Sequence, residues 1–276
     1  MLSAAQVSSY NGDGYLHVKG LFDREEVELL NFMARNDPSL KKNALARDNG
    51  QGGETRLALW SSAGDDFFGM ITRGDRLVTS VEQLVGEQVY HWHSKMIMKE
   101  PKVGGAWNWH QDYGYWYNDK CLFPKLISVF IAIDKSTREN GCLQVLRGSH
   151  NLGRIDHVRI GQQTGAEPER VDAACQQLET VYAEMEPGDA LYFHCNTLHR
   201  SDANLSDKPR WGLICCYNAG TNSPYGQTWQ STFKPIEKVP NNALKEARDR
   251  FMSESDQFLR DGIEDLESDL ADGKVK

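Results

Sequence analysis

The 276-residue sequence has no apolar run long enough to cross a bilayer and no low-complexity tract. Residues 1–7 contain neither a basic segment nor a sustained apolar segment, so no secretory signal is predicted. These absences exclude a transmembrane span and favour a protein of the cytoplasm that does not act at a membrane.

Paired cysteines and an excess of basic residues are also missing. The six cysteines include no C-x-x-C pair, which favours reduced thiols over a disulfide framework or a zinc ribbon. The formal net charge is −8, so a nucleic-acid-binding surface is not expected. The expected partner is therefore a small molecule.

Helical and extended patterns divide the chain into three parts. Two capping boxes, Ser3 with Gln6 and Asp23 with Glu26, predict helices within residues 1–40. Short apolar or alternating segments separated by turns predict an antiparallel sandwich or barrel over about residues 88–230. Apolar residues at helical spacing predict a helical extension over residues 241–276, which packs on the body or forms a homodimer. We expect one mainly β domain with flanking helices over residues 1–276.

Two polar segments are predicted to be irregular. Residues 41–54 are polar and rich in glycine, which predicts an exposed loop that could close over a pocket as a lid. Residues 153–177 contain three glycines and a proline and are predicted to be a loop or an insertion.

The segment WNWHQD at residues 107–112 contains the strongest candidate for a metal site. In an extended strand alternate side chains point to the same face, so His110 and Asp112 are predicted to project together. His199 is the best candidate for a third ligand. Two histidines and one carboxylate that leave other positions open are typical of non-haem Fe(II) oxygenases. For the H-x-D motif alone, a hydrogen-bonded pair without a metal is the alternative.

Two more histidines, His91 and His93, alternate with Lys95 on a predicted strand over residues 90–98. An H-x-H pair can bind zinc, so a zinc hydrolase that uses His91, His93 and His110 is one alternative. The following residues supply no further ligands, which favours two surface or hydrogen-bonding histidines. A non-enzymatic β protein that binds a small ligand or a metal is the other alternative.

A series of short motifs resembles the phytanoyl-CoA dioxygenase family of Fe(II)- and 2-oxoglutarate-dependent oxygenases. The resemblance extends from the N-terminal helices to about residue 229. The motifs are GDGY at 12–15, GLF at 20–22, HQD at 110–112, ENGCL at 139–143, GSH at 148–150, PGDA at 187–190, HRS at 199–201 and NLSDKPR at 204–210. Each motif is weak alone, whereas their common order is specific.

The resemblance implies a double-stranded β-helix core, jelly-roll and cupin-like, and a dioxygenase that uses Fe(II), 2-oxoglutarate and O2. It makes His110, Asp112 and His199 the iron ligands and the catalytic centre. It makes Arg210 the residue that binds the distal carboxylate of 2-oxoglutarate, with the hydroxyl of Ser201 assisting. A planar guanidinium suits this task because it can bind a carboxylate through two parallel hydrogen bonds. Since Asp112 stands where iron halogenases of this group have a small residue, hydroxylation is expected.

Aromatic residues crowd the predicted iron motif and suggest a substrate class. They are Trp107, Trp109, Tyr113, Tyr115, Trp116 and Tyr117. Aromatic faces attract cations, and Trp116 matches an aromatic residue in family members that act on a small zwitterion. Lys95 and Arg56 are candidates for holding an anionic end. The alternative is that half of these aromatic residues pack in the core.

We therefore expect a small zwitterionic metabolite, such as an amino- or trimethylammonio-phosphonate, a betaine or an amino acid. Trp116, Tyr113, Lys95 and Arg56 are predicted to bind it. An acyl-CoA or a secondary metabolite is the alternative substrate.

Overall fold

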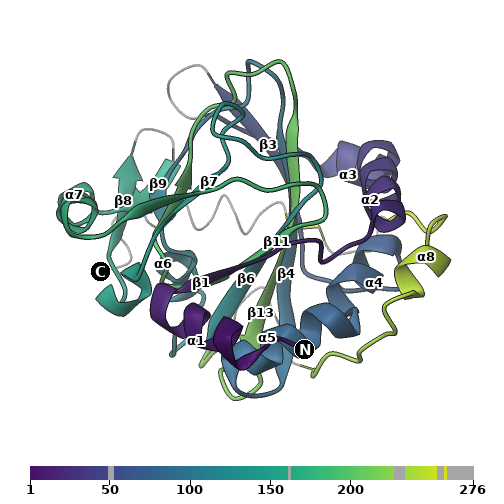
Figure 1. Cartoon of the computed structure of the whole chain (residues 1–276), viewed down its shortest axis with the longest axis horizontal. Helices are drawn as coiled ribbons and strands as arrows, with labels where there is room; N and C mark the ends of the chain where they lie inside the picture. Colours follow the sequence, from purple (N-terminus) through teal and green to yellow (C-terminus); the bar gives the residue numbers. More distant parts are fainter. Residues whose placement is uncertain (49–52, 161–162, 227–233, 254–257, 260–276) are drawn as a thin grey trace.

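The computed structural model describes residues 1–48, 53–160, 163–226, 234–253 and 258–259, and two sheets dominate this part of the chain (Figure 1). The large sheet contains, in spatial order, β1 (Tyr15–Val18), β11 (Ala190–His194), β6 (Leu126–Ala132), β13 (Arg210–Ala219), β4 (Val89–Lys99), β3 (Glu54–Trp60) and β2 (Leu45–Asp48). The small sheet contains β10 (Thr180–Ala183), β7 (Leu143–Leu146), β12 (His199–Ser201) and β5 (Trp107–His110). A separate hairpin joins β8 (His157–Ile160) and β9 (Gln163–Ala166).

The chain passes back and forth between the two sheets. From β4 to β7 successive strands alternate between the large and the small sheet, and β10 to β13 do the same. The pairings within both sheets are antiparallel. This winding is that of a double-stranded β-helix, or jelly roll. The predicted fold class, mainly β with flanking helices around such a core, is confirmed.

The large sheet packs on both faces, as strand β6 shows. All seven of its residues are buried. Val129 and Ile131 belong to the apolar cluster under the helices, while Phe130 and Ala132 belong to the cluster between the sheets. A strand covered on both faces has no polar side, which explains why residues 126–132 are apolar almost without interruption.

Helices cover the outer face of the large sheet. They are α1 (Ala4–Asp13), α2 (Arg24–Asn36), α3 (Pro38–Asn43), α4 (Phe67–Arg73), α5 (Asp75–Val85) and the single turn α8 (Ala243–Glu246). Both predicted capping boxes are present, at Ser3 for α1 and at Asp23 for α2. In Figure 1, α2, α3, α4 and α8 gather on one side of the molecule. No helix in the described ranges is long and apolar enough to cross a membrane.

Residues 153–177 were predicted to be a loop or an insertion, and the loop is wrong. They form β8, β9 and α7 (Pro168–Gln177), after the 3₁₀ turn Ser149–Leu152. Val171 and Ala174 of α7 are buried against Leu146 and Leu198 of the small-sheet region. This tertiary packing stabilises regular structure in a sequence whose local composition is typical of a loop.

The predictions for residues 41–54 and for the C-terminal segment hold only in part. Residues 41–43 belong to helix α3, residues 45–48 form strand β2 and residue 54 begins β3, so the predicted loop is wrong there. Residues 49–52 lie outside the described residues, and a lid stays a prediction. At the C-terminal side, Leu244 and Ala247 pack into the main core. Residues 254–257 and 260–276, where most of the predicted helical extension falls, lie outside the described residues.

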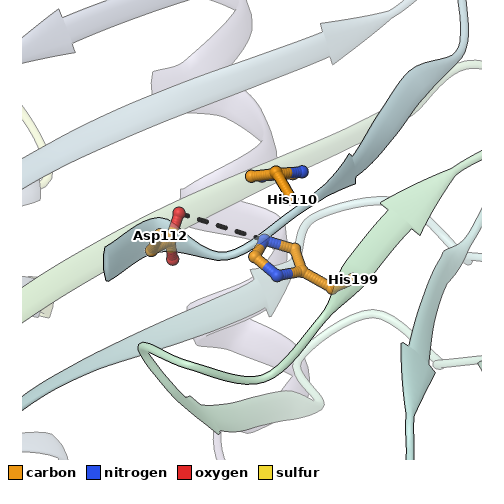
Figure 2. Close-up of side chains that lie close together, drawn as sticks. All are labelled: His110, Asp112 and His199. Atoms are coloured by element: carbon orange, nitrogen blue, oxygen red, sulfur yellow. Dashed lines mark ion pairs between the residues drawn. The ribbon is translucent and has the colours of Figure 1, made fainter. Parts of the chain in front are cut away.

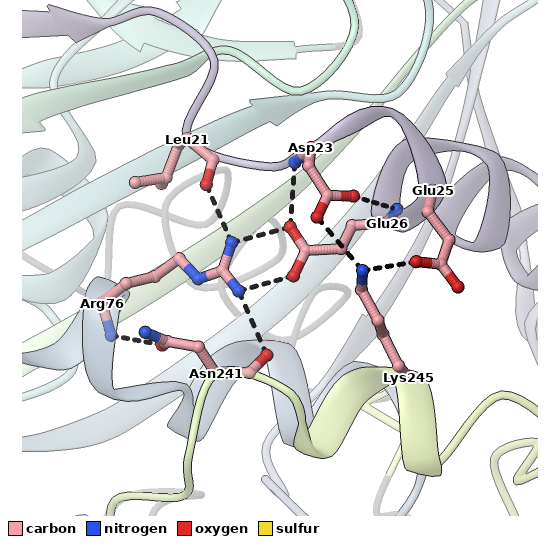
Figure 3. A network of polar contacts seen from close by, with 7 residues as sticks. All are labelled: Leu21, Asp23, Glu25, Glu26, Arg76, Asn241 and Lys245. Carbon is pink, nitrogen blue, oxygen red and sulfur yellow. Dashed lines mark hydrogen bonds and ion pairs between the residues drawn. The ribbon is translucent and has the colours of Figure 1, made fainter.

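A network of charged groups ties α2, α5 and the start of α8 together (Figure 3). Arg76 of α5 donates to both carboxylate oxygens of Glu26, at 2.7 and 2.5 Å. The same guanidinium donates to the carbonyl oxygens of Leu21 and Asn241, at 2.9 and 3.1 Å. The buried Glu26 also accepts from the Asp23 backbone N–H at 2.9 Å. We call these groups the Arg76–Glu26 network.

Candidate metal centre and anion site

Two neighbouring strands of the small sheet and the short helix that follows one of them bring His110, His199 and Asp112 together. His110 ends β5, and His199, which begins β12, is its direct partner across the small sheet. Asp112 does not lie on the strand as predicted but is the first residue of the short helix α6 (Asp112–Trp116). Gln111 between them is extended, with φ −112° and ψ 133°. The extended Gln111 therefore preserves the predicted convergence of His110 and Asp112.

The three side chains form a compact buried group (Figure 2). Each offers one ligand atom, and these atoms all lie within 4.8 Å of one another. His199 Nε2 lies 3.9 Å from Asp112 Oδ1, and the two imidazole centroids are 4.0 Å apart. Within the described ranges this is the one group of three or more such residues close enough to bind a metal ion.

Backbone carbonyls orient both imidazoles. The Nδ1 atom of His110 lies 2.8 Å from the carbonyl oxygen of Asn108, and Nδ1 of His199 lies 2.9 Å from that of Thr197. A carbonyl only accepts, so each Nδ1 carries the hydrogen and each Nε2 keeps its lone pair. Burial lowers the pKa of both histidines. At His110 the neighbouring His199 lowers the pKa further. Both rings are therefore neutral, as metal ligands must be.

The carboxylate of Asp112 contacts different groups through its two oxygens. Oδ2 accepts a hydrogen bond of 2.5 Å from Ser128 on β6, and Oδ1 lies 3.7 Å from Nζ of Lys95 on β4. Burial by itself raises the pKa of Asp112, but Lys95, the two histidines and the Ser128 hydroxyl outweigh it and lower the pKa. Asp112 is therefore ionised at neutral pH and can bind a cation.

The residue between the ligands, Gln111, anchors the whole segment. Its fully buried amide donates to the carbonyl oxygens of Gly153 and Asn196, at 2.8 and 2.7 Å, and accepts from the N–H of Ile155 at 2.7 Å. Three hydrogen bonds to distant backbone fix the turn from β5 into α6. Sequence reasoning assigned Gln111 no role because its partners lie far away in the chain.

A second buried polar group lies around Arg210, at the start of β13. The Arg210 side chain is 1% exposed, and its Nη2 donates to the carbonyl oxygen of Gly141 at 2.6 Å. Its buried Nε has no hydrogen-bond partner among the described residues. Lys99 is its direct partner across the β4–β13 pairing, and Nζ of Lys99 donates to Ser201 Oγ at 2.8 Å and to the carbonyl oxygen of Asp202. Arg210, Lys99 and Ser201 are called the anion site below.

Two buried cations meet in the anion site without an acidic partner. In the described part of the chain neither Lys99 nor Arg210 lies within ion-pair distance of a carboxylate. Burial lowers the pKa of Arg210 to about 10, and burial together with the charge of Arg210 lowers the pKa of Lys99 well below its usual value. Such a cluster fits an anionic ligand, because a carboxylate would neutralise the charge and accept the unused N–H groups.

Sequence reasoning missed Lys99, although a signal was present. Lys99 continues the alternation of His93, Lys95 and Ile97 on β4, whose side chains face the inside of the jelly roll. The predicted strand ended at residue 98, one residue too early.

The aromatic segment after Asp112 is helical, and its predicted substrate-binding residues Tyr113 and Trp116 are both buried. Trp116 is buried beside His93, with ring centroids 5.7 Å apart. The hydroxyl of Tyr113 donates to the carbonyl oxygens of Cys121 and Leu122, at 3.1 and 2.8 Å, and Tyr113 packs in the core between the sheets. The Tyr113 hydroxyl is therefore engaged in holding residues 121–122.

The remaining candidates differ in their positions. Arg56 is exposed on β3, opposite Met98 of β4. Among the described residues, the lysine or arginine that forms an ion pair with Asp112 is Lys95 and not Arg56. His91 and His93 were predicted to be surface or hydrogen-bonding residues. Both are buried, and His91 Nε2 lies within hydrogen-bond distance of Ser94 Oγ, at 2.9 Å. The predicted zinc group of His91, His93 and His110 does not form in the described residues.

A jelly roll with two histidines and one carboxylate converging inside it defines the class of mononuclear non-haem iron oxygenases. Comparison with known proteins is more specific: residues 10–212 match the phytanoyl-CoA dioxygenase family, and the chain belongs to this family. The recognition made from the sequence is confirmed, and with it the enzyme class of 2-oxoglutarate-dependent dioxygenases.

Individual relatives agree with this family. An ectoine dioxygenase of Bordetella bronchiseptica is 28% identical over 263 residues, covering 90% of this chain and 85% of the relative. An L-proline trans-4-hydroxylase of Streptomyces griseoviridis is 32% identical over 176 residues, covering 58% and 66%. The crystal structure of EctD from S. alaskensis with 2-oxoglutarate and 5-hydroxyectoine has a TM-score of 0.73 at 22% identity, covering 87% and 88%. The last comparison establishes a common fold.

Proposed function

We propose that this protein hydroxylates an unactivated C–H bond of a small polar molecule, with His110, Asp112 and His199 holding Fe(II). The observation that carries the proposal is the convergence of these three side chains beside a separate, buried anion site. The donor set fits the metal because two neutral imidazoles and one ionised carboxylate leave the other coordination positions open. Bound Fe(II), with 2-oxoglutarate and O2, supplies the oxidising power for hydroxylation.

The anion site suits the distal carboxylate of 2-oxoglutarate. Arg210 has a free Nε–H in the described structure, and Lys99 adds a second positive charge directly across the strand pair. Ser201, already bonded to Lys99, lies two residues after His199 on the same strand. The anion site would therefore bind the cosubstrate next to the metal ligands, and its burial keeps water away from the reaction.

For the substrate we propose a small zwitterion, such as an amino- or trimethylammonio-phosphonate, a betaine or an amino acid. The relatives are named for ectoine and L-proline, which are small molecules. Trp116 offers an aromatic face for a cationic group, and Lys95, partly exposed inside the jelly roll, offers a charge for an anionic group. Exposed Arg56 is a candidate for an outer contact, whereas Tyr113 contributes by packing alone.

An anaerobic titration with Fe(II) and 2-oxoglutarate tests the cofactor part of the proposal. A chelated keto-acid gives a weak visible charge-transfer band, and Arg210→Met should raise the 2-oxoglutarate concentration needed to produce it. Arg200→Met is the matched control, because Arg200 is bonded to Gln144 and stacks on Trp109 outside the anion site. Folded wild-type protein that forms no band would contradict the proposal.

A substrate panel tests the remaining part. With Fe(II) present, succinate release should be stimulated by zwitterionic metabolites of the classes named above. Stimulation by long acyl-CoA esters alone would contradict the proposed substrate class and leave the enzyme class intact.

A further inference from the structure

Asp112 presents its two oxygens to two different elements. Oδ2 is held at 2.5 Å by the hydroxyl of Ser128, which is fully buried on β6 and lies 3.4 Å from Sγ of Cys216. Oδ1 faces His199, with 3.9 Å to its Nε2, and lies 3.7 Å from Nζ of Lys95. Oδ1 is thus the oxygen available to an ion shared with the histidines, while Oδ2 is occupied by a neutral donor.

Lys95 has no other acidic partner in the described residues. It lies on the inner face of β4, its side chain is 21% exposed, and its ion pair with Asp112 is its only one there. The ammonium group of Lys95 lies 3.7 Å from Asp112 Oδ1 and 17 residues away from it in the chain, so the fold itself brings this cation to the carboxylate. A metal ion bound by Asp112 and the histidines would need the same Oδ1 that now faces this ammonium group.

We propose that Lys95 and the metal ion compete for Asp112 Oδ1, and that the ammonium group displaced by the metal holds the anionic group of the substrate. This inference rests on the proposed function and deepens it, because it assigns the carboxylate or phosphonate end of the substrate to Lys95. A half-buried cation that loses the charge of its partner binds an anion more strongly. Metal binding therefore precedes productive substrate binding.

Ser128 acts as a positioning residue for the same carboxylate, that of Asp112. By retaining Oδ2 it prevents the carboxylate from turning both oxygens toward the metal, which leaves more coordination positions open for cosubstrate and oxygen. Because the Ser128 hydrogen bond orients the carboxylate with Oδ1 free, Ser128 should strengthen metal binding, whereas the charge of Lys95 should weaken it.

The first test is the metal affinity itself, which does not depend on turnover. Metal-stripped protein is titrated with Mn(II), and free Mn(II) is read by its electron paramagnetic resonance signal. Lys95→Met should bind Mn(II) about tenfold more tightly and Ser128→Ala about tenfold more weakly, the scale typical of groups that support metal ligands. Lys95→Gln keeps a hydrogen-bond donor without the charge and should also bind more tightly.

Matched controls come from the same structure. Lys99→Met removes a buried cation four residues along the same strand, and Ser39→Ala removes a buried serine that donates to the carbonyl oxygen of Met252. Both should leave the Mn(II) affinity unchanged. If Lys95→Met and Lys95→Gln bind Mn(II) no more tightly than the wild type, or if Lys99→Met tightens binding equally, competition at Oδ1 is ruled out.

The second test concerns the anion. Methylphosphonate is titrated calorimetrically into protein saturated with Mn(II) and 2-oxoglutarate, and into metal-stripped protein. The loaded wild type should bind it about tenfold more tightly than the stripped protein or loaded Lys95→Met, the change expected for one charge-assisted contact. Equal binding by loaded wild type and loaded Lys95→Met would overturn the assignment of the substrate anion.

Failure of the inference and failure of the proposed function give different results. If wild-type protein binds neither Mn(II) nor Fe(II) with 2-oxoglutarate, the proposed function fails. If metal and 2-oxoglutarate bind but the Lys95 substitutions change neither titration, the inference alone fails.

Discussion

Arg76 and Arg210 are both held between elements that are far apart in the chain, but their surroundings are opposite. In the Arg76–Glu26 network the guanidinium meets both oxygens of one carboxylate and two backbone carbonyls (Figure 3). In the anion site Arg210 has one carbonyl partner, a buried Nε without a partner in the described structure, and the second cation Lys99 across the strand pair.

The difference indicates which buried charge serves the fold and which serves a ligand. A hydrogen-bonded ion pair holds together the two helices that carry it. Removing one member leaves the other charge buried and uncompensated. Two unpaired cations in the interior are costly, so they indicate a site whose neutralising partner is a ligand. Four predictions test this comparison, from the largest expected effect to the smallest.

Removing a proposed metal ligand should abolish activity without unfolding the protein. Loss of a residue that merely supports a ligand reduces metal affinity or activity about 10- to 100-fold, so His110→Ala and Asp112→Ala should exceed about 100-fold. Succinate release with Fe(II) measures activity, and circular dichroism checks the fold. Full activity in either variant would remove the proposed site.

Breaking the Arg76–Glu26 network should cost stability and spare the chemistry. Arg76→Met leaves the carboxylate of Glu26 buried without its cation. The side chain of Arg76 is 21% exposed. We therefore expect a loss of about 3 kcal/mol in the free energy of unfolding, the lower end for buried pairs. Urea denaturation measures this loss, and the turnover of the folded fraction should stay at the wild-type value. An unchanged unfolding midpoint would show that this network is not structural.

Arg210→Met should have the opposite effects, because it should weaken 2-oxoglutarate binding and cost no stability. Loss of charge-assisted hydrogen bonds of about 2 kcal/mol should weaken 2-oxoglutarate binding about 30-fold. The free energy of unfolding should be unchanged or higher, because a buried charge without an acidic partner has been replaced by an apolar side chain. The keto-acid band and urea denaturation provide the two readouts. Strong destabilisation with unchanged 2-oxoglutarate binding would place Arg210 with the structural arginines.

The pH dependence of 2-oxoglutarate binding should reveal Lys99. Burial and the charge of Arg210 lower the pKa of Lys99, so Lys99 loses its proton as the pH rises toward the usual lysine value of about 10.4. The 2-oxoglutarate carboxylates stay ionised there, and their affinity for the anion site should fall up to about tenfold with rising pH. In Lys99→Met this fall should be absent, because the guanidinium of Arg210 keeps its charge. Identical pH profiles would exclude this role for Lys99.

Local sequence accounts for much of the fold and for most of the proposed metal site. The capping boxes at Ser3 and Asp23 predict where helices begin, because their partners lie three residues away. The H-x-D spacing predicts that His110 and Asp112 converge, although Asp112 begins a helix, because only the extended backbone of Gln111 is needed. Residues 153–177 escaped prediction, since the packing of α7 against the small sheet, rather than its composition, stabilises its structure.

The sequence by itself determined the chemistry available to this protein: the types and order of the ligands, a distant arginine and a nearby aromatic segment. The tertiary structure alone decided which groups meet. Strand register places Lys99 opposite Arg210, and the passage of the chain between sheets places Ser128 and Lys95 on the two oxygens of Asp112. These contacts join residues at least 16 positions apart. No local pattern encodes such pairings, because they follow from how the two sheets pair and pack.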